Sequence, residues 1–204
     1  MSLEHSLSTA QRDQAPVAGI EGLISRHRFT VADYHAMARA GILTEDDRVE
    51  LLDGQIVKKM TINSPHAACV DRLTRLFVQQ LGDRAVVRIQ NPIQLDGYSE
   101  PEPDISLLRP KSDFYAEAHP MPADVVLVIE VADASLGRDR LVKVPLYARA
   151  GIREVWIVNL PARRIELFKE PSEDGYRETR LIDGGTLSPL AFPELELGIA
   201  ELLG

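Results

Sequence analysis

The stretch DVVLVIEVADAS, residues 124–135, decides the fold of this chain. Residues 125–131 include five β-branched side chains, and apolar residues occupy both alternating faces. This pattern is typical of a β-strand that is covered on both sides, as in the parallel part of an α/β sheet. One residue departs from the pattern, because Glu130 shares a face with Val126 and Val128.

The position of Glu130 predicts a partner for its carboxylate. A buried carboxylate without one costs several kcal/mol or stays protonated, so it needs a cation, hydrogen-bond donors or a water-filled pocket. A structural ion pair with Lys143 or Arg138 would meet that need. A functional site would meet it equally well.

The segments around this strand predict an α/β fold, a mixed β-sheet flanked by helices. A strand, a helix and a second strand follow one another between Val125 and Leu160, which implies a parallel crossover. Pro145 lies inside the predicted helix 139–150 and should kink it or delay its start. Further helices are expected at 30–41 and 64–82 and near the C-terminus, a hairpin at 48–60, and other strands at 85–95, 102–108, 153–160, 163–170 and 176–182.

Local signals mark the ends of these elements. Thr30 is a plausible N-cap with Asp33 three residues later, and Ser64 is the expected cap of the second long helix. Asp53 and Gly54 supply the tight turn of the hairpin. The buried core is expected to contain Cys69, Tyr147 and Trp156.

Composition fits one ordinary domain. The chain has 204 residues, 45% of them hydrophobic, with a formal charge of −8. We expect a flexible leader at 1–28 and a domain at 29–204. The single cysteine excludes a disulfide framework and a multi-cysteine zinc site. No stretch is apolar enough for a membrane span and the N-terminus lacks a signal-peptide pattern, so a cytoplasmic location and no membrane partner are expected.

Two carboxylates and a lysine stand out by their positions. Asp104 follows Pro103 at the start of one strand, Glu130 lies near the end of the next, and Lys143 lies on the helix that folds back over the sheet. Two carboxylates at adjacent strand ends suit Mg²⁺, which prefers oxygen ligands. An ammonium group beside them would support phosphodiester hydrolysis.

Several motifs together resemble a known family. They are VELLDGQIV, SPH at a helix start, PDI, VIEVAD, a lysine four residues before a tyrosine, and GIREVWIVN. From residue 29 to 203 the chain resembles the PD-(D/E)xK nuclease superfamily and, more narrowly, its Uma-two branch of restriction-endonuclease-like proteins. The resemblance implies a restriction-endonuclease-like fold, Mg²⁺-dependent cleavage of DNA with Mn²⁺ as a substitute, and a homodimer.

The resemblance also implies roles for individual residues. Asp104 and Glu130 match the metal-binding acids of the superfamily motif. The motif lysine usually follows the glutamate by two residues, where this chain has Ala132, and Lys143 would take that role from the helix. Glu50 and His66 match further positions of the family and are possible additional members of the site.

Each of these residues also has a structural interpretation. Asp104 could cap a turn after Pro103, which is a common role of aspartate. Lys143 could be an exposed helix residue paired with Asp139. Glu50 could face solvent from its strand. His66 could bond locally at the start of its helix.

Two other functions remain open at this point. A weak or inactive relative with the same fold could bind nucleic acid or protein, because a fold alone does not secure activity. An unrelated hydrolase with paired carboxylates, such as a glycosidase, is less well supported because only 5% of residues are aromatic. The chain has no GxSxG, HExxH, Walker or GxGxxG motif, and its five histidines show no metal-ligand spacing.

Overall fold

The computed structural model describes residues 26–204. The predicted leader at 1–28 therefore lies almost entirely outside the described residues. In chain order the structure contains α1 (Val31–Arg39), β1 (Val49–Leu52), β2 (Gln55–Lys58), α2 (Ser64–Leu81), β3 (Val86–Ile89), β4 (Ile105–Leu108), β5 (Val125–Ala132), α3 (Leu136–Arg138), a π-helical turn (Asp139–Lys143), α4 (Val144–Arg149), β6 (Glu154–Asn159), β7 (Arg164–Ser172), β8 (Gly175–Ile182), β9 (Thr186–Leu187), β10 (Leu197–Gly198) and α5 (Ile199–Leu203). Short 3-10 turns lie at Glu45–Asp47, Gly82–Arg84 and Pro122–Asp124.

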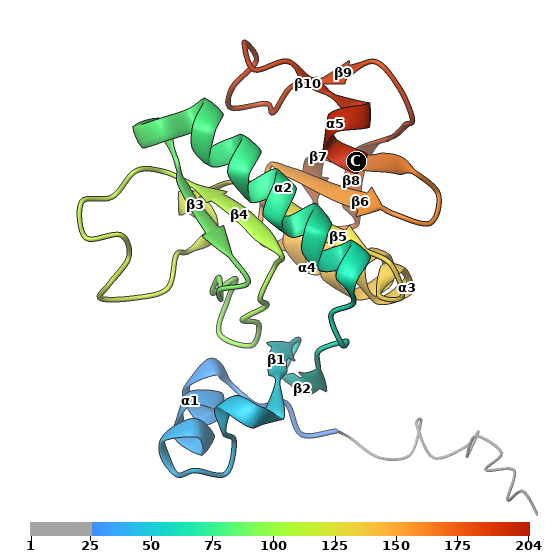
Figure 1. Cartoon of the computed structure of the whole chain (residues 1–204). Coiled ribbons are helices and arrows are strands. Elements are labelled where there is room, and N and C mark those ends of the chain that lie inside the picture. The colour runs from blue at the N-terminus through green and yellow to red at the C-terminus, as the bar shows by residue number, and fades with distance from the viewer. Residues whose placement is uncertain (1–25) are drawn as a thin grey trace, which may run out of the picture.

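A six-stranded mixed sheet forms the centre of the molecule (Figure 1). Its strand order is β3-β4-β5-β6-β7-β8. Only β5 and β6 pair in parallel, and every other neighbouring pair in this sheet is antiparallel. The predicted mixed sheet, the parallel crossover and the edge position of the last long strand are therefore confirmed.

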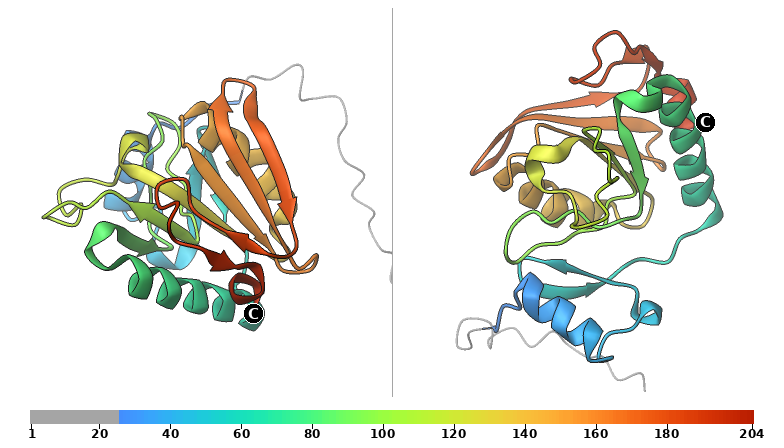
Figure 2. Two further views of the ribbon diagram at one scale, coloured as in Figure 1. Left: turned by 90° about the horizontal axis from the view of Figure 1, so that it is seen from above. Right: turned by 90° about the vertical axis from the view of Figure 1, so that its left-hand side faces the viewer.

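Helices cover both faces of this sheet (Figure 2). On one face α2 and α5 pack against a core that includes Leu127, Ile129 and Val131 of β5, together with Trp156. On the other face α4 packs against a second core that includes Val128 and Ala132 of β5. Burial of each of these Val, Leu and Ile side chains stabilises the fold by about 1.5–3 kcal/mol. The predicted two-sided burial of this strand is confirmed.

The parity of β5 also decides where Glu130 points. Its side chain alternates with Ile129 and Val131, so it faces the same core as Val128 and Ala132. That face is covered by the helical segment from α3 to α4. The sequence expectation of a mostly dry carboxylate is confirmed, because Glu130 is 2% exposed.

The first two helices begin as their caps dictate. Thr30 caps α1, and its side chain and backbone exchange hydrogen bonds with Asp33, as predicted. The expectation for α2 was wrong by one residue. Asn63 is the N-cap, because its side-chain oxygen accepts the His66 N–H at 3.0 Å, whereas Ser64 is the first helical residue.

The helix predicted at 139–150 begins earlier and contains a wider turn. Regular winding starts at Leu136, changes to a π-helical turn over Asp139–Lys143 and resumes in α4. The Val144 N–H donates to the Asp139 carbonyl, five residues back. Pro145 has no N–H, and its ring would clash with the carbonyl four residues earlier, so a wider turn relieves the strain. The delayed start predicted from Pro145 was therefore wrong, and the irregularity beside this proline is a π-helical turn.

Helix α1 and the hairpin β1–β2 lie together beyond one end of the sheet (Figure 2). The hairpin turns at Asp53 and Gly54, which both have positive φ, as predicted for this pair. Glycine is required at the second position for another reason too, because a Cβ there would lie 2.6 Å from the Arg28 Cβ. Leu51 forms an isolated bridge with Glu100, which ties the hairpin to the stretch before β4.

Among the described residues, no helix has both the length and the apolar character needed to cross a membrane.

Candidate active site

A pocket lies where the hairpin, the start of α2, the strands β4 and β5 and the π-helical turn meet. The charged residues around it are six acids and four bases. They are Glu50, Glu102, Asp104, Glu130, Asp133 and Asp139, with Arg48, Lys59, Arg138 and Lys143. His66 and Gln90 also line it. A pocket with this excess of carboxylates favours cations.

Lys143 is the partner of the buried Glu130. The Lys143 Nζ lies 3.1 Å from Oε1 of Glu130. The hydroxyl of Tyr147 donates to the same oxygen at 2.6 Å. Lys143 and Tyr147 are four residues apart, so one helical face presents both groups to the strand. Lys143 itself is 3% exposed, so the interpretation of an exposed lysine paired with Asp139 was wrong.

Glu50 shares the same lysine from the hairpin side. Its Oε2 lies 3.2 Å from the Lys143 Nζ and accepts the Glu102 N–H at 3.1 Å. Its Oε1 is buried and has no hydrogen-bond partner, although Arg138 approaches to 3.9 Å. Glu50 is 1% exposed, so the interpretation of a solvent-facing strand residue was wrong. An unsatisfied buried oxygen of this kind is suited to a cation or a water molecule.

Asp104 is held by β5 and by the start of α2. Its Oδ2 accepts the Val131 N–H at 2.8 Å and lies 3.1 Å from Nε2 of His66. Gln90 donates to Oδ1 at 3.2 Å. These contacts reach across three elements, so Asp104 is more than a turn cap after Pro103. His66 likewise does more than bond locally, because its ring contacts Asp104 while its backbone N–H is capped.

The protonation of the buried pair follows from its surroundings. Burial raises the pKa of Glu130 to about 8, although the Lys143 ammonium opposes the shift. Burial alone would lower the pKa of Lys143, but the carboxylates of Glu130, Glu50 and Asp139 outweigh it and raise the pKa. Lys143 therefore stays an ammonium ion. It can stabilise negative charge but cannot act as a base near neutral pH.

The pKa values of Asp104 and His66 are shifted in opposite directions by their contact. Burial raises the pKa of Asp104, but the His66 contact and the Val131 N–H outweigh it, so the pKa is lowered. The hydrogen bond that the His66 ring donates to the Asp104 carboxylate raises the pKa of His66, against the effect of burial. Asp104 is thus available as an anion.

The structure brings together all five residues named from the sequence. Asp104, Glu130, Lys143, Glu50 and His66 all line one pocket, although they come from five parts of the chain.

Sequence reasoning placed Tyr147 correctly in the core but missed its bond to Glu130. Its spacing of four residues from Lys143 was the available signal. Gln90 and Asp139 also line the pocket, and no local pattern marks them.

The donor set of the pocket fits a divalent cation that prefers oxygen. Asp104, Glu130 and Glu50 supply carboxylate oxygens, one of them buried without a partner. The oxygens do not form a tight cluster as they stand. Within residues 26–204, the one group of three His, Cys, Asp or Glu side chains with ligand atoms all within 4.8 Å is His35, Glu100 and His119. Its two histidines are 84 residues apart along the chain, so their spacing in the sequence shows no sign of the group.

Comparisons with known proteins agree with this architecture. A solved structure described as "a putative nuclease belonging to DUF820" from Anabaena variabilis superposes with a TM-score of 0.66. It is 14% identical, and the match covers 86% of this chain and 97% of that one. At this identity the likeness shows the fold. No curated protein matches the sequence.

A family model gives the more specific result. The model of the Uma2 family, described as "Putative restriction endonuclease", matches residues 31–200. This range takes in the hairpin, the whole six-stranded sheet and every residue of the pocket described above. The chain therefore belongs to the Uma2 family of restriction-endonuclease-like proteins.

Proposed function

We propose that this chain is a metal-dependent endonuclease that hydrolyses phosphodiester bonds in DNA. The observation that carries the proposal is the pocket lined by Asp104, Glu130 and Glu50. The last two contact a buried ammonium, and one carboxylate oxygen of Glu50 has no partner. Buried ionic groups in a purely structural role are normally fully bonded. An incompletely bonded set that lines a pocket is suited to a ligand.

In this proposal Asp104 and Glu130 hold Mg²⁺, for which Mn²⁺ can substitute, and Glu50 contributes from the hairpin. Bound there, the ion would polarise a phosphoryl oxygen and lower the pKa of a bound water. His66 and the Val131 N–H fix the orientation of Asp104. Tyr147 fixes that of Glu130.

Lys143 acts as a fixed positive charge. Its ammonium lies between Glu130 and Glu50 and stays protonated, so it would stabilise the negative charge that builds on the phosphate. Basic side chains line the same pocket, and Arg48 and Arg138 among them could contact the phosphate backbone. The net charge of −8 predicts weak, salt-sensitive binding of DNA.

The proposal includes an assembly and a location. A homodimer is expected from the family resemblance, because such nucleases commonly cut one strand with each chain. A cytoplasmic location is expected from the sequence alone. Sedimentation analysis of the purified protein tests the first, and fractionation of cells tests the second.

Titration with Mn²⁺, followed by calorimetry, tests the metal site. Asp104→Asn and Glu130→Gln should each abolish binding, while Asp71→Asn, on the exposed face of α2, should leave it unchanged. Unchanged affinity in both pocket variants would exclude this site.

A plasmid-nicking assay with Mg²⁺ or Mn²⁺ then tests the reaction. The wild type should nick the plasmid, and Lys143→Ala should remove the activity. If the wild type binds metal but cleaves neither DNA nor RNA with either ion, the chain is a binding module with a nuclease fold.

A further inference from the structure

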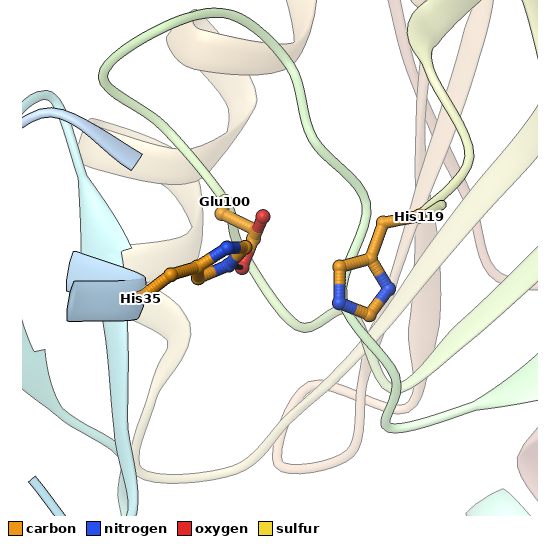
Figure 3. Close-up of side chains that lie close together, drawn as sticks. All are labelled: His35, Glu100 and His119. Atoms are coloured by element: carbon orange, nitrogen blue, oxygen red, sulfur yellow. Dashed lines mark hydrogen bonds and ion pairs between the residues drawn. The ribbon is translucent and has the colours of Figure 1, made fainter. Parts of the chain in front are cut away.

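Three potential metal ligands meet outside the pocket (Figure 3). His35 comes from α1, Glu100 from the stretch between β3 and β4, and His119 from the stretch between β4 and β5. One ligand atom from each lies within 4.8 Å of the other two. Up to 84 residues separate them along the chain, so this arrangement exists only in the folded protein.

The carboxylate of Glu100 is incompletely bonded. Its side chain is 2% exposed, and its Oε1 lies 2.8 Å from Nε2 of His35. Its Oε2 is buried and has no hydrogen-bond partner. An unsatisfied buried carboxylate oxygen is costly, and a cation bound beside it would remove that cost.

The surroundings of the three side chains leave room for ligand exchange. The side chain of His35 is 40% exposed and His119 is partly exposed, whereas Glu100 is buried. The rings of His35 and His119 lie 6.3 Å apart between centroids at an interplanar angle of 69°. Two imidazoles at the surface over one buried carboxylate leave a further coordination position open to water.

This donor set selects a different kind of metal from that of the carboxylate pocket. Imidazole nitrogen suits Zn²⁺ and its neighbours in the first transition series, whereas Mg²⁺ prefers oxygen. Two histidines and one glutamate with an open position are a known zinc ligand set. With bonds of about 2.1 Å, tetrahedral ligand atoms lie about 3.4 Å apart, so small side-chain rotations would complete the site.

We infer that His35, Glu100 and His119 form a second metal site, which takes Zn²⁺ or a similar transition metal. The ion would join α1, the stretch between β3 and β4 and the stretch between β4 and β5. Glu100 also pairs with Leu51, next to Glu50, and its N–H donates to the Leu51 carbonyl at 2.8 Å. The site would thus fix α1 and the hairpin against the stretch that leads to Asp104.

Binding of Zn²⁺ tests the inference independently of nuclease activity. The double variant Asp104→Asn/Glu130→Gln removes the carboxylate pocket as a competing site and should still bind one Zn²⁺ by calorimetry. In that background His119→Asn should weaken the affinity by more than about 100-fold, because even outer partners of metal ligands are worth 10–100-fold. His27→Asn, at an exposed histidine outside the cluster, is the matched control and should change nothing.

Two further measurements keep the test decisive. Co²⁺ should give visible absorption bands of a tetrahedral site in the double variant, and His35→Asn should remove them. Zn²⁺ should raise the Tm of the double variant but not that of its His119→Asn derivative. Zinc affinity unchanged by His119→Asn and His35→Asn, or lost in the double variant alone, would overturn the inference. If His35→Asn fails to fold, the His119→Asn result decides.

Discussion

Glu130 and Glu166 occupy the same row of the sheet but have opposite surroundings. Both pair with Ile157 across the sheet, Glu130 from β5 and Glu166 from β7. Both are 2% exposed, and both receive a cation from the π-helical turn. They lie two strands apart, which is about 10 Å.

The difference lies in how completely each carboxylate is bonded. The guanidinium of Arg140 donates hydrogen bonds to both oxygens of Glu166, and the Asn159 side chain donates to Oε1 at 2.7 Å. Glu130 lines the pocket, and its cation, Lys143, is shared with Glu50. A planar guanidinium can bond both oxygens of one carboxylate. A single ammonium shared by two carboxylates leaves some of their oxygens able to bind a metal ion. The comparison separates a carboxylate bonded on both oxygens from the one that we propose as a metal ligand.

The largest expected effect is on stability when the shared cation is removed. Lys143→Met leaves Glu130 and Glu50 buried without their positive charge, so the free energy of unfolding should fall by about 3–5 kcal/mol. Arg140→Met should cost less, because the Arg140 side chain is 38% exposed and water can take its place beside Glu166. Equilibrium unfolding in urea measures both. A larger loss in Arg140→Met would break the comparison.

The next effect is on cleavage. Glu130→Gln should abolish metal-dependent plasmid nicking, because this variant should no longer bind the ion on which the reaction depends. Glu166→Gln should retain close to the wild-type rate, because Glu166 does not belong to the pocket lining found among residues 26–204. Equal losses in both variants would show that the row acts as one unit.

The hydroxyl groups of two tyrosines are expected to have smaller effects on stability. Tyr147→Phe removes a hydrogen bond to a carboxylate and should cost about 1.5–3 kcal/mol of stability. Tyr176→Phe removes a bond of 2.7 Å to the neutral Ile152 carbonyl and should cost about 0.5–1.5 kcal/mol. Only Tyr147→Phe should also weaken Mn²⁺ binding. Unchanged Mn²⁺ affinity in that variant would remove Tyr147 from the site.

The smallest expected effect concerns pH. Burial raises the pKa of Glu166, but the bonds from Arg140 and Asn159 outweigh it, so the pKa lies below its usual value of 4.5. The stability that the charged form contributes is therefore present above pH 4.5 and is lost as the pH falls through the lowered pKa. Glu166→Gln lacks this titration. Urea unfolding from pH 6 to pH 3 should show wild type losing its advantage over the variant in the acid range.

The sequence predicts the sheet well because buried strand positions carry apolar residues in a regular pattern. The apolar residues of β5 occupy both faces, and the parallel pairing with β6 follows from the helix between them. The details that the sequence does not predict depend on which of several neighbouring residues caps a helix and on how the backbone adjusts to a proline. Asn63 outcompetes Ser64 as the cap of α2, and the π-helical turn depends on how the chain accommodates Pro145.

The candidate pocket was predictable to the extent that its residues lie on regular elements. Asp104 and Glu130 stand at the ends of adjacent strands, and the returning helix brings Lys143 to them. His35, Glu100 and His119 could not be found in this way. Two of the three come from irregular stretches whose paths no periodicity reveals, so only the folded structure shows their proximity.

The wider turn at Asp139–Lys143 makes the site sensitive to the deletion of a single residue. It contains one residue more than ordinary winding needs, and it carries both Arg140 and Lys143 to carboxylates two strands apart. An in-frame loss of a single codon there would restore regular winding and swing one of the two cations by about 100° around the helix axis. The number of residues in this turn therefore decides whether Arg140 and Lys143 can both reach their carboxylates.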